Sequence, residues 1–190
     1  MKKIAIIPGS FNPFHKGHLN LGVIIKELED FDEIFYLISP NNPFKNEKDL
    51  LNIDSRIKIL ELSIKNHDNF KICDYELRLP KPSYTYRTMK VLEEQFPNTE
   101  FTICLGSDAY NSITKWKKFD YLKKFSYIAI VRDKEKIDPN IKKIIETSEI
   151  ISNNSLSSTL IRNNIKKNND YSGLVNKDVE KHIKIHNLYE

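Results

Sequence analysis

The chain is poor in cysteine, with only two among its 190 residues. Cys73 and Cys104 each lie inside an apolar run, and two cysteines alone supply neither a disulfide framework nor a zinc site. Because free cysteine behaves as a small apolar side chain, we expect both thiols to be reduced and buried in strands. A chain of this length buries roughly 70% of its unfolded surface, so its core can be stable without disulfide bonds or a structural metal ion.

Long apolar runs are also missing. No stretch approaches the about 20 apolar residues that a membrane helix requires. The first apolar run, at residues 4–7, ends at Pro8 and is too short for a secretory signal. We therefore expect a cytoplasmic protein without a membrane partner.

Charge of one sign is not concentrated anywhere in the chain. Its 30 lysines and arginines are set against 26 acidic residues, a net charge of +4, and the lysines are scattered. Nucleic-acid-binding domains gather basic residues on one face, so we expect no nucleic-acid partner. The small positive excess suits a site for a polyanionic nucleotide, and the composition leaves homo-oligomerisation open.

Apolar runs of strand length alternate with segments of helical period along the chain. We predict strands at residues 3–8, 33–39, 70–73, 100–105, 127–131 and 149–151. We predict helices at residues 17–29, 83–96, 157–167 and 175–185. One further helix is predicted to begin after an N-cap at Asp54 and another at Asp138-Pro139, and residues 77–82 are expected to form an irregular loop. Nearly unbroken apolar strands indicate a parallel sheet covered on both faces. The sequence therefore predicts an α/β, Rossmann-like, doubly wound parallel sheet in a single domain, residues 1–190, with a helical C-terminal portion at about 155–190.

The loop after the first predicted strand carries the sequence GSFNPFHKGH, residues 9–18. Gly9 allows a sharp turn out of the sheet, and Gly17 allows a ligand to approach the first helical turn. His15 and His18 are three residues apart and project to the same side of that turn, where free backbone N–H groups and the helix dipole attract anions. Two imidazoles there could donate to phosphate and offset negative charge. The alternative is that one histidine caps or packs and the other is exposed, while zinc is disfavoured because no third ligand lies nearby.

These ten residues resemble the signature of the HxGH nucleotidyltransferase superfamily. Further segments are similar to those of bacterial nicotinate-nucleotide adenylyltransferases: Ser83-Tyr84-Thr85, Gly106-Ser107-Asp108, Trp116, Leu156–Arg162 with the sequence LSSTLIR, and His186-Asn187-Leu188-Tyr189. The resemblance spans nearly the whole chain. It implies transfer of AMP from ATP to the 5′-phosphate of nicotinate mononucleotide, giving nicotinate adenine dinucleotide and pyrophosphate in NAD biosynthesis. Mg²⁺ is implied as the companion of ATP, held mainly by the phosphates.

The resemblance also assigns roles to individual residues. His15, His18 and Arg162 are the expected catalytic residues. The expected ATP-binding residues are Gly9, Ser10, Phe11, His15, Gly17, His18, Gly106, Asp108, Ser157, Ser158, Thr159 and Arg162. The expected residues for the pyridine mononucleotide are Asn12, Lys45, Tyr84, Thr85, Asp108, Trp116 and Lys117. No Ser-His-Asp arrangement is needed, because a phosphate monoester with a second pKa of about 6 is already mostly dianionic at neutral pH.

Several alternatives stay open at this point. The Ser157–Thr159 segment could be an ordinary helix cap, Asp108 a helix N-cap, Trp116 a core residue and Lys45 a solvated lysine. The acceptor could be nicotinamide mononucleotide or phosphopantetheine, although phosphopantetheine enzymes usually carry Thr in place of the first His. Cytidylyltransferases differ in the second motif, and class I aminoacyl-tRNA synthetases carry a KMSKS-like loop that is absent here. A non-catalytic nucleotide-binding module is the rival from another class.

Overall fold

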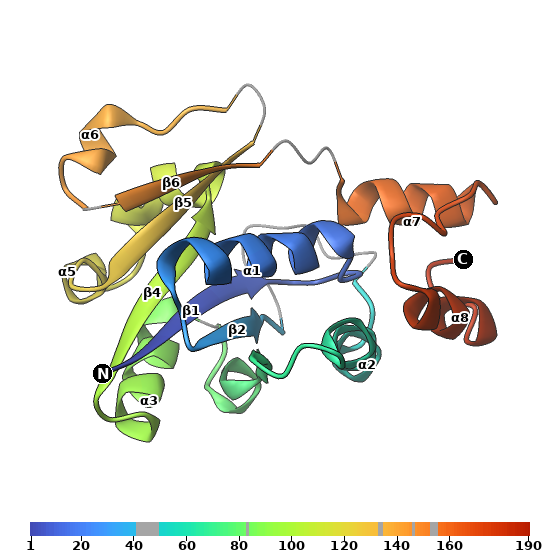
Figure 1. The fold of residues 1–190 in the computed structure, drawn as a ribbon, viewed down its shortest axis with the longest axis horizontal. Coiled ribbons are helices and arrows are strands. Elements are labelled where there is room, and N and C mark those ends of the chain that lie inside the picture. The colour runs from blue at the N-terminus through green and yellow to red at the C-terminus, as the bar shows by residue number, and fades with distance from the viewer. Residues whose placement is uncertain (41–49, 83, 133–134, 146, 153–155) are drawn as a thin grey trace.

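The computed structural model describes residues 1–40, 50–82, 84–132, 135–145, 147–152 and 156–190. Its centre is a six-stranded, all-parallel sheet in the order β3-β2-β1-β4-β5-β6 (Figure 1). The strands are β1 (Lys2–Gly9), β2 (Glu33–Ile38), β3 (Phe70–Cys73), β4 (Thr99–Gly106), β5 (Ser126–Arg132) and β6 (Thr147–Ser152). The prediction of a doubly wound parallel sheet is confirmed, and all six predicted strands are present.

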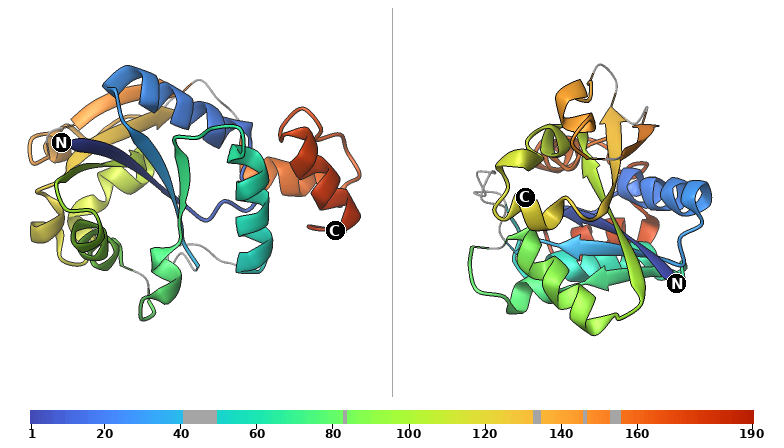
Figure 2. Two further views of the ribbon diagram at one scale, coloured as in Figure 1. Left: turned by 60° about the horizontal axis from the view of Figure 1, so that its bottom comes forward. Right: turned by 90° about the vertical axis from the view of Figure 1, so that its left-hand side faces the viewer.

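Helices cover both sides of this sheet (Figure 2). They are α1 (Lys16–Glu29), α2 (Ile53–Ile64), α3 (Thr85–Gln95), α4 (Ser107–Asn111), α5 (Phe119–Leu122), α6 (Pro139–Lys142), α7 (Ser158–Lys166) and α8 (Lys177–Ile185), with 3-10 turns η1 (Tyr75–Arg78) and η2 (Ile113–Lys115). One hydrophobic cluster joins the sheet to α1, α2, α7 and α8. A second cluster joins it to α3, α4, α5 and α6. None of the helices in the described ranges is long and apolar enough to cross a membrane.

The two C-terminal helices share the core of the sheet. Ile161 and Ile165 of α7 and Val179 and Ile183 of α8 are buried in the first cluster. The side-chain amide of Asn176, the N-cap of α8, donates to the Leu62 carbonyl oxygen of α2 at 2.8 Å. The C-terminal helical segment is therefore fixed to the face of the sheet that α1 and α2 cover.

The local predictions were wrong at a few places. Helix α2 is capped by Asn52, whose side-chain oxygen accepts from the Ser55 N–H at 2.8 Å, and not by Asp54. Part of the predicted loop at 77–82 belongs to η1, and the helix after Asp138 is a single turn. The sequence analysis also missed α4 and α5, because elements of four or five residues are too short to show a helical period.

The two thiols are buried as predicted. Cys73 ends β3, and Cys104 lies within β4. Burial raises the pKa of the Cys73 thiol to about 12, so this thiol stays protonated at neutral pH and behaves as a core side chain.

Gly22 lets α1 approach the sheet closely. A Cβ atom at this position would lie 2.1 Å from the hydroxyl oxygen of Tyr36, which is fully buried and donates to the His18 carbonyl oxygen at 3.1 Å. We predict that Gly22→Ala lowers the free energy of unfolding by about 1–3 kcal/mol, despite the better helix propensity of alanine. The control is Gly173→Ala, because no atom lies within 4 Å of the added Cβ. Equal stabilities of the two variants in urea titrations would contradict the close approach.

Candidate active site

Two of the predicted motifs begin at the carboxyl ends of β1 and β4. β1 pairs with β2 on one side and with β4 on the other, so the strand order reverses between β1 and β4. Doubly wound sheets bind their ligands in the crevice at such a switch point. Gly9 ends β1 and Gly106 ends β4, which places the two Gly-containing motifs on either side of this crevice.

The turn after β1 has its left-handed residue at Phe11. The φ angle of Phe11 is 49°, and none of the glycines in the described part of the chain has a positive φ. The Phe11 ring is buried and contacts the rings of Phe14, His18 and Tyr36, with centroids 5.2 to 5.8 Å apart. A Cβ on Gly9 would lie 2.6 Å from this ring. Gly9 is therefore needed because the Phe11 ring lies so close to it. We expected Gly9 to allow the sharp turn out of the sheet, but Gly9 is still part of β1 and the left-handed residue is Phe11.

His15 and His18 stack at the start of α1. Their ring centroids are 3.7 Å apart, and the planes differ by 22°, so both rings lie on one side of the first turn, as predicted. His15 is the N-cap of α1, and its backbone N–H donates to Nδ1 of His18 at 3.3 Å. An Nδ1 that accepts a hydrogen bond places the proton of the neutral ring on Nε2. His18 can thus present an N–H donor through its other ring nitrogen.

Two backbone donors of the first turn of α1 are already used within the protein. The Lys16 N–H donates to the Leu174 carbonyl oxygen at 3.0 Å, and the His18 N–H donates to the His15 carbonyl oxygen at 2.9 Å. The prediction that the first-turn N–H groups are free for an anion was therefore wrong for Lys16 and His18. The Lys16 contact arises because the segment between α7 and α8 packs against the start of α1, although the two are far apart in sequence.

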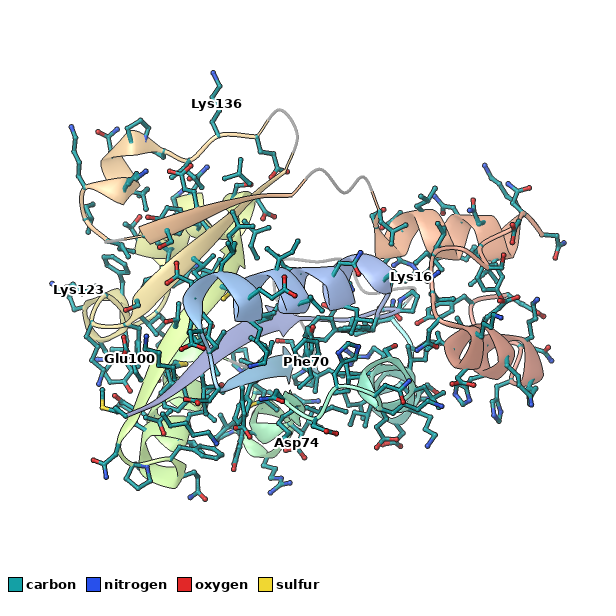
Figure 3. The ribbon with its side chains drawn as sticks, in the orientation of Figure 1. Lys16, Phe70, Asp74, Glu100, Lys123 and Lys136 are labelled. Atoms are coloured by element: carbon teal, nitrogen blue, oxygen red, sulfur yellow. The ribbon has the colours of Figure 1, made fainter. Side chains whose placement is uncertain are left out.

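Arg162 of α7 lies against the loop that carries the two histidines. Its Nη1 donates to the Asn12 carbonyl oxygen at 2.8 Å, and its Nη2 donates to Oγ1 of Thr159 at 3.3 Å. The Ser158 hydroxyl donates to the Pro13 carbonyl oxygen at 2.9 Å. In Figure 3 the labelled Lys16 marks the start of α1 beside α7. The fold therefore brings together the motifs from the two ends of the chain.

Two predicted binding residues also have structural contacts. Ser157 is the N-cap of α7, and its hydroxyl oxygen accepts from the Leu160 N–H at 3.1 Å, which is the alternative noted for this serine. Asn12 is 7% exposed, and its side-chain oxygen accepts from the Leu51 N–H at 3.2 Å. These contacts hold α7 and the loop between β1 and α1, residues 10–15 and called the motif loop below, in place.

Three of the residues predicted for the pyridine nucleotide, Tyr84, Thr85 and Lys117, lie around the start of α3. Tyr84 is the N-cap of α3, and Thr85 is its first residue. The Lys117 ammonium group lies 4.7 Å from the centroid of the Tyr84 ring. Trp116 is half-buried and packs against the second hydrophobic cluster. The structure therefore brings Lys117 to the start of α3. Lys45, its neighbour Phe44, and Ser83 lie outside the described residues.

Asp108 lies at the carboxyl end of β4. It is exposed and belongs to the first turn of α4, whose N-cap is Gly106, so the alternative of Asp108 as the cap was wrong. The neighbouring Ser107 is buried, and its hydroxyl donates to a Glu135 carboxylate oxygen. Asp108 thus presents a carboxylate at the switch point.

Two buried charged residues near the site were missed from the sequence. Arg56 of α2 is 1% exposed and Glu76 of η1 is 4% exposed. Burial raises the pKa of the Glu76 carboxyl, and hydrogen bonds from Ser39 and Thr88 oppose this effect. The sequence did offer a signal for the burial of Arg56, because this charged residue lies among the apolar positions of a predicted helix, between Ile53 and Leu60.

Comparisons with known proteins show the family of the chain. Residues 6–164 match the model of the family described as cytidylyltransferase-like. The probable nicotinate-nucleotide adenylyltransferase of Bacteroides fragilis (strain YCH46) is 33% identical over 95% of this chain and 90% of its own length. The protein of the same description from Azobacteroides pseudotrichonymphae is 36% identical over 88% of this chain and 89% of its own length.

Solved structures point the same way. The nicotinic acid mononucleotide adenylyltransferase of Plasmodium falciparum complexed with APC superposes with a TM-score of 0.83 at 25% identity, over 100% of this chain and 98% of the other. The same enzyme complexed with NaAD gives a TM-score of 0.81 with the same coverage. The chain belongs to the cytidylyltransferase-like family of nucleotidyltransferases, and within it to the nicotinate-nucleotide adenylyltransferases.

Proposed function

We propose that this enzyme transfers AMP from ATP to nicotinate mononucleotide, forming nicotinate adenine dinucleotide and pyrophosphate. The observation that carries this proposal is the contact between the Arg162 guanidinium and the Asn12 carbonyl oxygen at 2.8 Å. This contact brings a forked cation to the loop that ends in the stacked His15 and His18. Residues 1–190 act as one nucleotidyltransferase domain in this proposal, in the cytoplasm and without a nucleic-acid or membrane partner.

The reaction needs alignment and charge stabilisation more than activation. A 5′-phosphate oxygen of the mononucleotide attacks the α-phosphorus of ATP, and the bond to pyrophosphate breaks. Negative charge grows on the departing pyrophosphate, so donors placed beforehand lower the barrier. In this proposal the His18 Nε2–H and the Arg162 guanidinium provide these donors. His15, Ser10 and the backbone of the turn at residues 9–11 hold further phosphate oxygens.

The donor set fits ATP that arrives with Mg²⁺. In the part of the chain that the structure describes, no group of three or more His, Cys, Asp or Glu residues is placed to hold a metal ion. The proposed triphosphate site offers mainly N–H and O–H donors, which complement phosphate oxygens. Mg²⁺ usually keeps its water and phosphate ligands and needs few protein ligands. We propose that Mg²⁺ bound with ATP would offset charge on the triphosphate, and that the exposed Asp108 at the end of β4 could serve as a carboxylate ligand.

The surroundings of α3 favour an acidic pyridine substituent. Lys117 lies beside Tyr84 at the N-terminus of α3, where the helix dipole and the ammonium group both attract a carboxylate. We expect kcat/KM for nicotinate mononucleotide to exceed that for nicotinamide mononucleotide by about fivefold or more, since such a charge contributes about 1 kcal/mol. Lys117→Met should narrow this ratio. A preference for the amide in paired assays of pyrophosphate release would overturn the assignment.

The rival proposal is a nucleotide-binding module without catalysis. Pyrophosphate release from ATP, measured with and without nicotinate mononucleotide, separates the two. Release that depends on the mononucleotide supports the adenylyltransferase. Absence of release with every mononucleotide tested, together with a rise in melting temperature on addition of ATP, supports the binding module.

A further inference from the structure

Two buried charged side chains meet at one serine at the end of β2. Arg56 and Glu76 are almost completely buried, and each contacts Ser39. Burying a charge is costly unless hydrogen bonds replace the lost water. Both charges therefore depend on their hydrogen bonds. These bonds link Ser39 to the loop after β1 through Arg56 and to α3 through Glu76.

Arg56 holds the chain where it leaves β1 and β2. Its Nη1 donates to the carbonyl oxygens of Ser10 and Ser39, both at 2.8 Å, and its Nη2 donates to that of Pro40 at 3.1 Å. The Ser39 N–H in turn donates to the Gly9 carbonyl oxygen at 3.0 Å. One planar guanidinium group thereby fixes two neighbouring loops relative to each other.

The bond from Arg56 to the Ser10 carbonyl oxygen sets the direction of a backbone N–H donor in the motif loop. The N–H and C=O groups of a trans peptide point in opposite directions. Because the Ser10 carbonyl points at Arg56, the Phe11 N–H points away from Arg56. Phe11 also holds an unfavourable left-handed conformation, with a φ of 49°, and such conformations persist only when the surroundings hold them. The Arg56 bond to the preceding carbonyl oxygen is one such contact, beside the packing of the Phe11 ring on its aromatic neighbours.

Glu76 connects the same serine to α3. Its Oε2 accepts from the Ser39 hydroxyl at 2.7 Å, and its Oε1 accepts from the Thr88 hydroxyl at 3.3 Å. Thr88 is fully buried and lies one turn after Tyr84, the N-cap of α3. The carboxylate therefore ties the start of α3 to the end of β2.

We infer that Arg56, Ser39, Glu76 and Thr88 form a buried bridge that positions the two substrate sites relative to each other. Arg56 orients the motif loop for binding of ATP. Glu76 and Thr88 position the start of α3 for binding of the mononucleotide. These four are positioning residues, since they act through the backbone that they hold. The inference rests on the proposed function and adds residues outside the sequence motifs to it.

The bridge predicts that substitutions at its two ends raise KM for different substrates. Thr88→Val removes one hydroxyl in the interior of α3, and we expect it to raise KM for nicotinate mononucleotide about fivefold while KM for ATP changes less than about twofold, as for loss of one hydrogen bond. Arg56→Lys should do the reverse, raising KM for ATP about tenfold, because one ammonium group cannot replace the fork. Glu76→Gln can still accept from one hydroxyl and donate to the other, so it should stay close to wild type, whereas Glu76→Leu should resemble Thr88→Val.

Ser63→Ala is the matched control, because the Ser63 hydroxyl donates only locally, to the Ile59 carbonyl oxygen within α2 at 2.7 Å. Equal effects of Thr88→Val and Ser63→Ala on the mononucleotide KM would overturn the bridge. So would a Thr88→Val variant in which both constants rise together with a fall in melting temperature.

The proposed function and the bridge fail in different ways. A wild-type enzyme that releases no pyrophosphate contradicts the function, and the bridge is then judged by binding. In that case Arg56→Lys should reduce the rise in melting temperature caused by ATP, relative to Ser63→Ala. An unchanged rise would contradict the bridge. Wild-type turnover with unshifted constants in the Thr88 and Arg56 variants contradicts the bridge alone.

Discussion

Replacing His18 by alanine is expected to lower kcat about 100- to 1,000-fold, the usual loss when a donor to a charged transition state is removed. The stacked position beside His15, with the proton on Nε2, makes His18 the strongest candidate for that donor. Stopped-flow measurement of pyrophosphate release under saturating substrates tests this expectation. The melting temperature should fall by a few degrees, because the His15 N–H loses its acceptor at the helix N-terminus, a loss of about 1 kcal/mol.

His18→Asn separates the capping contact from catalysis. The side-chain oxygen of asparagine occupies nearly the place of Nδ1 and can accept from the His15 N–H, but nothing replaces Nε2. We expect this variant to regain most of the melting temperature and little of the turnover. Recovery of both would mean that His18 serves only as a structural cap.

Arg162→Lys is expected to lower kcat/KM for ATP about 10- to 100-fold although the positive charge is kept. Arg162 uses Nη1 on the Asn12 carbonyl and Nη2 on Thr159, so its fork holds the motif loop and faces the proposed triphosphate at once. A single ammonium group cannot do both. The measurement is the dependence of the initial rate on ATP at saturating mononucleotide.

Lys167→Ala is the control for this prediction. Lys167 is an exposed cation at the C-terminal end of the same helix, so its loss changes the charge near α7 without touching the motif loop. We expect less than a twofold change in kcat/KM, as for most exposed charges. Equal losses in the two variants would indicate a general charge effect and would remove the specific role of Arg162.

The sheet could be predicted from the sequence because its strands are buried on both faces. Central parallel strands such as β1 and β4 require continuous apolar runs, and these runs are visible without an alignment. The meeting of α7 with the motif loop was also expected, because the family resemblance assigned His15, His18 and Arg162 to one catalytic site. The contact between Arg162 and Asn12 joins residues 150 positions apart.

The features that the sequence did not reveal depend on contacts between distant segments. The place of Arg56 on the apolar side of a predicted helix indicates burial, but only the folded chain shows the carbonyl groups of Ser10, Ser39 and Pro40 around its guanidinium. The left-handed turn at Phe11 is similar, because a bulky residue rarely adopts this conformation without tertiary support.

A crystal structure of the enzyme with a non-hydrolysable ATP analogue tests the central claim most directly. We predict one triphosphate at the end of β1, with phosphate oxygens within hydrogen-bond distance, about 2.7–3.2 Å, of the Arg162 guanidinium and of a ring nitrogen of His15 or His18. A triphosphate bound elsewhere, or one that contacts the histidines while Arg162 stays turned toward Asn12 and Thr159 alone, would contradict it.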